Sequence, residues 1–340
     1  MDLVTNHPAD ADGLRGKAGA LTTGSGRRVW ARRLLVVALA GFAVWAIASN
    51  ASEIRASLRQ LSAWAVAAAF VPAILSMVLA LFVWRSLMTD LGFRLPVRAA
   101  ARIFFISQLG KYVPGSVWSI VTQIELSRPF KIPKRTSVTV GVLAIAVSIT
   151  SGLSLAALLL PFSGQATIHR YWWIMLIIPV LLGALHPAVL GPALNLLLRL
   201  ARRPPLPQTP SLGGMGLVAA MVGGIWLLLG LQVWVLLVGL GAPPARSLVV
   251  AVGGYALAYS LGQLAVGLPA GAGVREAALT VALSAVVPGP IALTVALLAR
   301  GILTVVDLGM AGLQYLIGLR TKPLGEKPGA RSSPGAGPPR

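Results

Sequence analysis

Two hydrophobic stretches of the chain are interrupted by glycine and proline, and both interruptions carry charged residues. The first reads SQLGKYVPGS over residues 107–116, and the second reads SLGQLAVGLPAGAGVRE over residues 260–276. Hydrophobic segments that are interrupted at corresponding places in two halves are the best sequence indication of a binding site in a transporter. The two stretches together therefore predict a site for a transported molecule.

Both interruptions offer groups that can bind a negatively charged head group. Glycines expose backbone N–H groups, and the helix that follows each turn presents the positive end of its dipole. Lys111 and Arg275 add full positive charges. The alternative is that proline and glycine only allow close helix packing. The predicted site residues in the two stretches are Gln108, Lys111, Pro114, Gly115, Gln263, Pro269, Gly271, Gly273, Arg275 and Glu276.

Further charges lie in apolar surroundings, where an ionisable side chain usually faces a cavity or a partner. Glu276 could pair with a basic residue or carry a proton. Arg300, Thr304 and Asp307 are spaced i, i+4 and i+7, which places them on one helical face. Arg300 is a candidate phosphate ligand because its planar guanidinium can bind two oxygens. Its alternative role is a structural ion pair with Asp307 or Glu276.

The elements that position these residues are predicted to be membrane helices. The chain of 340 residues is 56% hydrophobic, with a mean hydropathy of +0.81. Such a chain has too little polar surface for a soluble protein, so the predicted fold class is an all-α polytopic membrane protein. A signal peptide at residues 34–49 is disfavoured by the 33 residues before it. The candidate spans, the first slightly short, are residues 34–49, 63–87, 136–160, 171–185, 217–241, 248–268 and 291–319.

The basic residues predict the topology. The formal net charge is +20, and basic residues precede the first span and follow the last. The positive-inside rule then places both termini in the cytoplasm and requires an even number of crossings. Residues 98–135 are basic at both ends, which predicts a re-entrant hairpin that turns at Pro114 and Gly115. A second hairpin over residues 248–287 leaves six full spans. The alternative is eight full spans.

Residue spacing predicts that the two halves form an inverted repeat. The predicted organisation is a disordered basic tail over residues 1–30, membrane repeats over residues 31–160 and 171–319, and a second disordered basic tail over residues 320–340. An offset of 155 residues aligns Gln108 with Gln263, Pro114 with Pro269, and Pro133 with Pro288.

Two groups of residues outside the predicted site have simpler interpretations. Glu125 and Arg128, spaced i and i+3, are expected to form a surface ion pair. Several tryptophans lie mostly near predicted span ends, where indole is typical of the membrane–water interface. We expect interface anchors at Trp64, Trp84, Trp118, Trp172, Trp173 and Trp234.

Several function classes are excluded or disfavoured by the composition. The chain has no cysteine, which excludes thiol catalysis and thiolate metal sites, and its three histidines have no metal-ligand spacing. The phosphate-binding P-loop motif is also missing. We expect no metal, no cofactor and no enzymatic activity. Nucleic-acid binding is not expected, because the basic tails fit attraction to anionic lipid and no soluble nucleic-acid-binding module accompanies them.

Three motifs resemble those of a known family. QLGKYVPGSVW at residues 108–118, LPAGAGVRE at residues 268–276 and LLAR ending at Arg300 are similar to the flippase-like transmembrane domain of the lysylphosphatidylglycerol synthase family. The resemblance covers roughly residues 30–320. It implies translocation of a charged lipid or a lipid-linked sugar between leaflets. The family elements would be Pro114 and Gly115, then Pro269, Gly271, Gly273 and Glu276, and finally Arg300.

The resemblance also sets expectations about activity and partners. Two-domain members carry a soluble aminoacyl-transferase domain after the membrane part, whereas this chain ends about twenty residues after its last predicted span, so we expect no synthase activity. The leading hypothesis is a lipid flippase or scramblase of the cytoplasmic membrane, with an anionic or sugar-linked lipid as its partner. The alternatives are a non-transporting scaffold for an envelope or glycolipid biosynthesis enzyme, a membrane-embedded transferase, and a small-molecule or ion transporter. The sequence does not indicate an oligomeric state.

Overall fold

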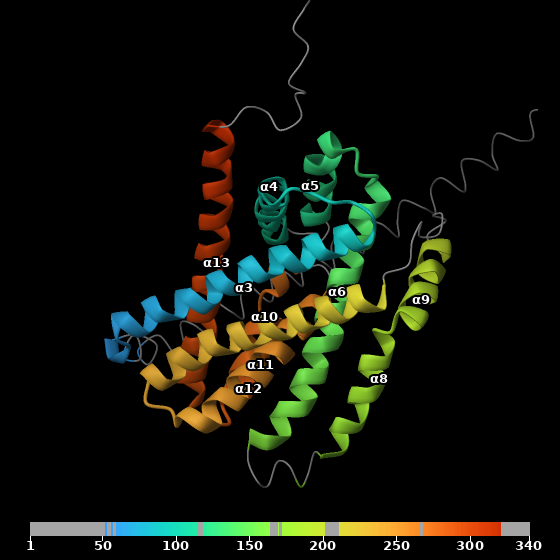
Figure 1. The fold of residues 1–340 in the computed structure, drawn as a ribbon. Coiled ribbons are helices and arrows are strands. Elements are labelled where there is room, and N and C mark those ends of the chain that lie inside the picture. Colours follow the sequence, from blue (N-terminus) through green and yellow to red (C-terminus); the bar gives the residue numbers. More distant parts are fainter. Residues whose placement is uncertain are drawn as a thin grey trace, which may run out of the picture. The chain divides into compact units, whose positions relative to one another are not determined.

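A computed structural model of the chain describes residues 59–113, 118–163, 172–200, 211–265 and 268–320, together with residues 52, 56 and 169. All regular elements within these residues are helices (Figure 1), which confirms the all-α prediction. The predicted span at residues 34–49 and the predicted turn at Pro114 and Gly115 lie outside the described residues.

Five helices in the described residues are long and apolar enough to cross a bilayer. Large apolar side chains project from them, and Val71, Leu227 and Val305 are each more than half exposed. Such surfaces suit contact with lipid, and the chain is a multi-pass membrane protein. The five helices are α3 (Ala63–Asp90), α6 (Lys134–Leu159), α10 (Leu212–Gly239), α11 (Pro244–Leu264) and α13 (Gly289–Arg320).

The region predicted as a span over residues 171–185 is divided into short elements. It contains the 3₁₀ helix η5 (Trp172–Leu176) and α8 (Ile177–Ala184), and α9 (Pro187–Leu200) follows. Pro187 explains the division, because the residue before proline is biased away from the helical conformation and proline suits the first position of a new helix. The apolar run is therefore not one continuous helix.

Two units of helix, break and helix stand between long helices. The first consists of α4 (Val97–Gln108), the 3₁₀ turn η2 (Leu109–Tyr112) and α5 (Trp118–Ser127). The second consists of α11, the 3₁₀ turn η6 (Pro269–Gly271) and α12 (Val274–Leu283).

The helices on either side of each break, called its arms here, differ in length. α4 has 12 residues, and α5 and α12 have 10 each, so they are about 15–18 Å long, roughly half the hydrocarbon thickness. α11 has 21 residues and is long enough to cross a bilayer by itself. The second unit is therefore less symmetric than a simple re-entrant hairpin.

The helices α3 and α10 have equal lengths and similar end signals. Each has 28 residues and begins after a serine, Ser62 or Ser211, whose hydroxyl accepts a hydrogen bond from a backbone N–H of the first turn. Each is followed by a glycine with positive φ, Gly92 at 88° and Gly241 at 83°. That conformation ends a helix at little steric penalty only in glycine.

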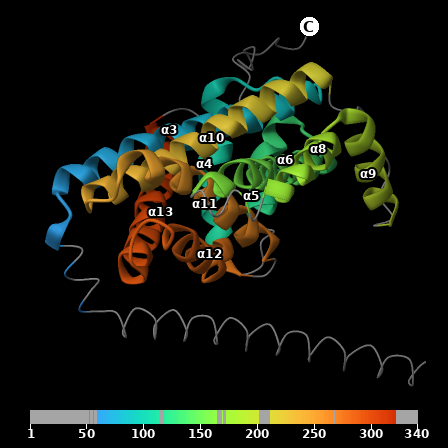
Figure 2. The ribbon, with the colours of Figure 1, turned by 90° about the horizontal axis from the view of Figure 1, so that it is seen from below.

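These two helices lie side by side and antiparallel (Figures 1 and 2). At one end, Asp90 accepts hydrogen bonds from the Ser211 backbone N–H at 2.8 Å and from the Ser211 hydroxyl at 2.6 Å. At the other end, a Cβ atom added at Gly239 would lie 2.9 Å from Ala65 Cβ. One end is thus joined by polar contacts and the other by close packing.

Small residues allow α11 to lie close to its neighbours, and α11 is the most buried of the five long helices. A Cβ atom at Gly230 of α10 would lie 2.5 Å from Val252 Cα of α11. A Cβ atom at Gly152 of α6 would lie 2.3 Å from Ser260 Oγ. Close contact of this kind is a main source of helix association in lipid, so these glycines position the helix that leads into the second break.

Gly230→Ala is expected to destabilise the protein, because the added methyl group would overlap with Val252. Overpacking of this kind costs roughly 1–3 kcal/mol. Gly223→Ala is the matched control in the same helix, since nothing lies within 4 Å of its added Cβ. Thermal unfolding in detergent, followed by tryptophan fluorescence, should give a lower melting temperature for Gly230→Ala only. Equal melting temperatures would contradict the close approach of α10 and α11.

Candidate functional site

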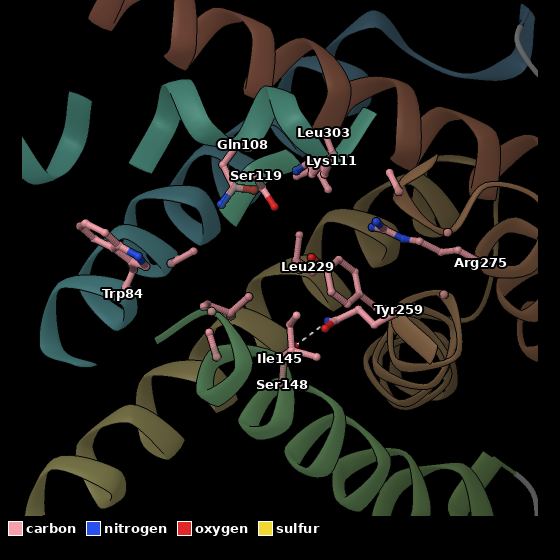
Figure 3. A pocket seen from close by; sticks show the side chains of 18 of the residues that line it. Trp84, Gln108, Lys111, Ser119, Ile145, Ser148, Leu229, Tyr259, Arg275 and Leu303 are labelled. Carbon is pink, nitrogen blue, oxygen red and sulfur yellow. Dashed lines mark hydrogen bonds between the residues drawn. The ribbon is translucent and has the colours of Figure 1, made fainter. Parts of the chain in front are cut away.

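Both breaks line one cavity of about 320 Å³ (Figure 3). Six of the predicted site residues are on its wall, and they come from the first break, the second break and α13. The cavity therefore brings together parts of the chain that are far apart in sequence. The six are Gln108, Lys111, Gln263, Gly271, Arg275 and Arg300.

The first break is joined to α13 by a buried ion pair. Lys111 Nζ lies 2.6 Å from Asp307 Oδ2, and the Asp307 side chain has no exposed surface. The Tyr112 hydroxyl donates a hydrogen bond to the same Asp307 oxygen. Asp307 does not line the cavity itself and acts on it through Lys111. The pair thereby fixes η2 against the last helix.

The second break is joined to α13 by another ion pair, between Arg300 and Glu276. The Arg300 guanidinium also donates to the carbonyl oxygens of Ala270 at 3.3 Å and Pro269 at 3.4 Å. These carbonyls belong to η6, where helical hydrogen bonding is interrupted. Arg300 therefore lines the cavity and satisfies backbone acceptors of the break.

Two glycine N–H groups of the second break already have acceptors within the break. The Gly273 N–H donates to Glu276 Oε2 at 2.6 Å, and the Gly271 N–H donates to the Leu268 carbonyl at 3.2 Å. Glu276 thus occupies the N-terminus of α12, where we expected an anionic head group. The cationic groups that face the cavity from this side are side chains rather than backbone amides.

Arg275 differs from the other two cations of the cavity. Its residue surface is 8% exposed, and within the described residues no carboxylate lies within 4.0 Å of it. The guanidinium carbon instead lies 4.8 Å from the Tyr255 ring centroid and 4.4 Å from the Tyr259 ring centroid. The guanidinium also donates to the Tyr255 hydroxyl. Arg275 points into the cavity beside Tyr259 (Figure 3).

The rest of the polar wall is uncharged. Gln263 donates from Nε2 to Ser148 Oγ at 2.8 Å, the contact drawn in Figure 3. Gln123 is buried and accepts a hydrogen bond from the Trp84 indole N–H at 3.2 Å. Ser119 lies nearby on the same wall. Amides and hydroxyls of this kind can both donate and accept hydrogen bonds.

Aromatic residues of the site were not identified from the sequence. We expected Trp84 at the membrane interface, but it is 2% exposed and lines the cavity, because Gln123 satisfies its indole. Tyr255 and Tyr259 are spaced i and i+4 in the turns before the second break, a spacing that places them on one helical face. Two tyrosines on one helical face beside a break were the sequence signal that could have identified them as site residues. Trp64, by contrast, is 83% exposed, as a surface position requires.

The remaining predicted residues are placed as follows. Pro114 and Gly115 lie outside the described residues. Pro269 and Gly273 do not line the cavity but contact Arg300 and Glu276, respectively. The expected surface pair of Glu125 and Arg128 is confirmed at 2.8 Å, with both side chains more than half exposed.

Asp307→Asn is expected to destabilise the protein, because it leaves the Lys111 charge without its partner. Removing one member of a buried pair costs about 3–5 kcal/mol, and the 23% exposure of the Lys111 side chain reduces that loss here. The double variant Lys111→Met with Asp307→Asn removes both charges and should recover part of the melting temperature. Glu125→Gln in the exposed pair is the control and should change little. A double variant less stable than Asp307→Asn would contradict the pairing.

Comparison with known proteins gives the family of the chain. No curated protein sequence matches the chain. A family model described as the lysylphosphatidylglycerol synthase TM region matches residues 30–310, which include both breaks, both ion pairs and Arg275. The match covers most of the 340 residues. The chain therefore belongs to the family of the lysylphosphatidylglycerol synthase transmembrane region.

Proposed function

We propose that the protein is a flippase or scramblase that moves a polar-headed lipid between the two leaflets of a membrane. The observation that carries this proposal is the cavity shared by the two breaks, with Lys111, Arg275 and Arg300 on its wall. In such a mechanism the head group crosses through the cavity while the acyl chains stay in the surrounding lipid. The predicted lipid is an anionic phospholipid or a lipid-linked sugar, and no catalytic step is involved.

The physical properties of a bilayer support this interpretation. Non-helical backbone at membrane depth is tolerated only where it is buried in protein or lines a wet cavity. Both η2 and η6 meet that requirement, because residues of each line the cavity. Charged side chains at this depth also destabilise the protein unless they bind a partner or line a transport pathway. A site for a charged head group accounts for both features.

We further propose that the two halves are an inverted repeat with six spans and two hairpins. The order long helix, short arm, break, short arm and long helix occurs twice, although α11 is longer than α4. The corresponding helices α3 and α10 are antiparallel, as inversion requires. Rocking of the two repeats around the cavity would then expose the site to each side in turn.

We propose one topology, with both termini in the cytoplasm and the protein in the cytoplasmic membrane, and the contacts between helix ends are consistent with the way it divides these ends between two sides. On the predicted cytoplasmic side, Asp90 contacts Ser211, and Arg102 packs against Gly318. On the opposite side, the Arg246 guanidinium donates to the carbonyl of Ser163. Each pair joins two ends that the proposed topology assigns to the same side.

Single introduced cysteines test this topology, since the chain has no native cysteine. Lys134→Cys and Ala245→Cys both replace exposed residues near helix starts. In intact cells, a membrane-impermeant maleimide should label Ala245→Cys, whereas Lys134→Cys should react only after permeabilisation. Labelling of both cysteines from the same side would contradict the proposed inversion.

Lipid movement itself can be measured in vesicles reconstituted with the purified protein. Fluorescent lipids added to a native lipid extract should exchange between leaflets faster than in protein-free vesicles. Arg275→Met should slow exchange by about tenfold or more, because a hydrogen bond to a charged group contributes roughly 1.5–3 kcal/mol. Arg128→Met, at an exposed position, is the control and should exchange at the wild-type rate.

The same experiment separates transport from a scaffold role. If wild-type protein does not accelerate exchange of any lipid, the transport proposal is wrong. A non-transporting scaffold for a glycosyltransferase or lipid-modifying enzyme would instead retain its enzyme partner in Arg275→Met and wild type alike.

A further inference from the structure

We infer that the head group carried by this site is a monoanionic phosphodiester whose remaining part is uncharged and rich in hydroxyl groups. This inference rests on the proposed transport function and specifies its substrate class. It follows from the charge balance of the cavity, from the surroundings of Arg275, and from the neutral polar groups on the opposite wall.

The charged residues at the cavity do not balance. The three cations are Lys111, Arg275 and Arg300, and the carboxylates that contact this set are those of Asp307 and Glu276. Each carboxylate is already paired with one cation, Asp307 with Lys111 and Glu276 with Arg300. Among the described residues, three positive and two negative charges leave a net charge of +1. A ligand with one negative charge neutralises the site.

Arg275 is where the unbalanced charge resides. It is more than nine-tenths buried, and burying a charge is costly unless an opposite charge compensates for it. The faces of Tyr255 and Tyr259 hold the guanidinium by cation–π contact. Tyrosine rings cannot supply a full negative charge, so the site is electrostatically complete only when an anion enters.

The donors of Arg275 suit the two free oxygens of a phosphodiester. A guanidinium has five N–H donors in a planar fork, and within the described residues one of its nitrogens donates to the Tyr255 hydroxyl. The remaining donors have no acceptor among the described residues and are available to a ligand. A planar fork binds two phosphate oxygens at once, which an ammonium group cannot do with the same geometry.

The rest of the wall favours neutral hydroxyl groups over a second charge. Gln108, Gln123, Gln263 and Ser119 supply amides and a hydroxyl. Within the described residues no hydrogen bond is recorded from the Gln108 side chain, so its amide is available to a ligand. A positively charged amine on the head group would find no unpaired carboxylate among the described residues around the cavity. A second negative charge on the head group would leave the occupied site with a net negative charge.

The size of the cavity is consistent with a head group alone. Its volume is about 320 Å³, at the lower end of the range for small-molecule sites. A glycerol, inositol or sugar phosphodiester combines one negative charge with several hydroxyls and leaves its acyl chains outside. Polyol-bearing lipids are therefore the class that the wall recognises.

Matched lipid probes test separately whether the site requires one negative charge and whether it requires hydroxyl groups on the head group. Vesicles containing the full-length protein would receive tail-labelled phosphatidylglycerol, phosphatidylethanol, phosphatidylcholine or phosphatidic acid. Phosphatidylethanol is a monoanionic phosphodiester without free hydroxyls, so it separates charge from hydrogen bonding. We expect phosphatidylglycerol to exchange at least tenfold faster than phosphatidylcholine and phosphatidic acid, with phosphatidylethanol between them.

Two variants assign the preference to residues. Arg275→Met should reduce phosphatidylglycerol exchange to the phosphatidylcholine rate. Gln108→Leu should slow phosphatidylglycerol severalfold but leave phosphatidylethanol unchanged. Without lipid, Arg275→Met should melt at the same temperature as wild type or higher, because it removes a buried charge that lacks a carboxylate. A purely structural Arg275 would instead give a lower melting temperature, which would overturn the inference.

The outcomes distinguish this inference from the proposed function. Equal acceleration of all four lipids would overturn the substrate class and leave transport intact. Phosphatidylethanol as fast as phosphatidylglycerol would overturn the hydroxyl requirement. No acceleration of any lipid would overturn both the substrate class and transport.

Discussion

The interruption of backbone hydrogen bonding inside an apolar protein is the constraint on which the rest of the structure depends. Each break exposes polar backbone that a bilayer cannot satisfy, and side chains of α13 contact both breaks. Arg300 contacts carbonyls of η6, and Asp307 binds Lys111 of η2. Asp307 lies seven positions after Arg300, about 10.5 Å along the helix. One straight helix thereby holds both breaks at neighbouring depths, and the cavity forms where they meet.

This arrangement also explains why the cations of the site are not equivalent. Arg300 and Lys111 each have a carboxylate that ties them to the framework. Arg275 is held by aromatic faces instead. A charge held by ring faces keeps most of its hydrogen-bond donors for a ligand. The structure thus separates residues that maintain the cavity from the residue best suited to bind an anion.

The sequence was sufficient to identify the charged residues of the site but not its aromatic ones. Ionisable residues are rare in membrane segments, so Lys111, Arg275 and Arg300 stood out. Tyr259 did not, because in an apolar run hydropathy does not distinguish a tyrosine that faces a cavity from one that faces lipid. The sequence offered Arg300 as a partner for either Glu276 or Asp307, and the structure confirms the pair with Glu276. The pairing of Asp307 with Lys111 was not predicted, because it depends on a tertiary contact between distant segments. The Gly273 N–H donates to Glu276 only three residues further along the chain, so this local contact could have been found from the sequence, but it was not predicted.

No carboxylate among the described residues pairs with Arg275, and this affects the electrical work of transport. If the protein charges stay in place, a monoanionic head group that passes this site transfers one negative charge across the membrane. Moving that charge across a membrane potential of 100 mV changes its free energy by about 2.3 kcal/mol. In a cell with a negative interior, this energy favours the outer leaflet roughly 50-fold. An exchange pathway without its own energy source would therefore still produce an asymmetric bilayer.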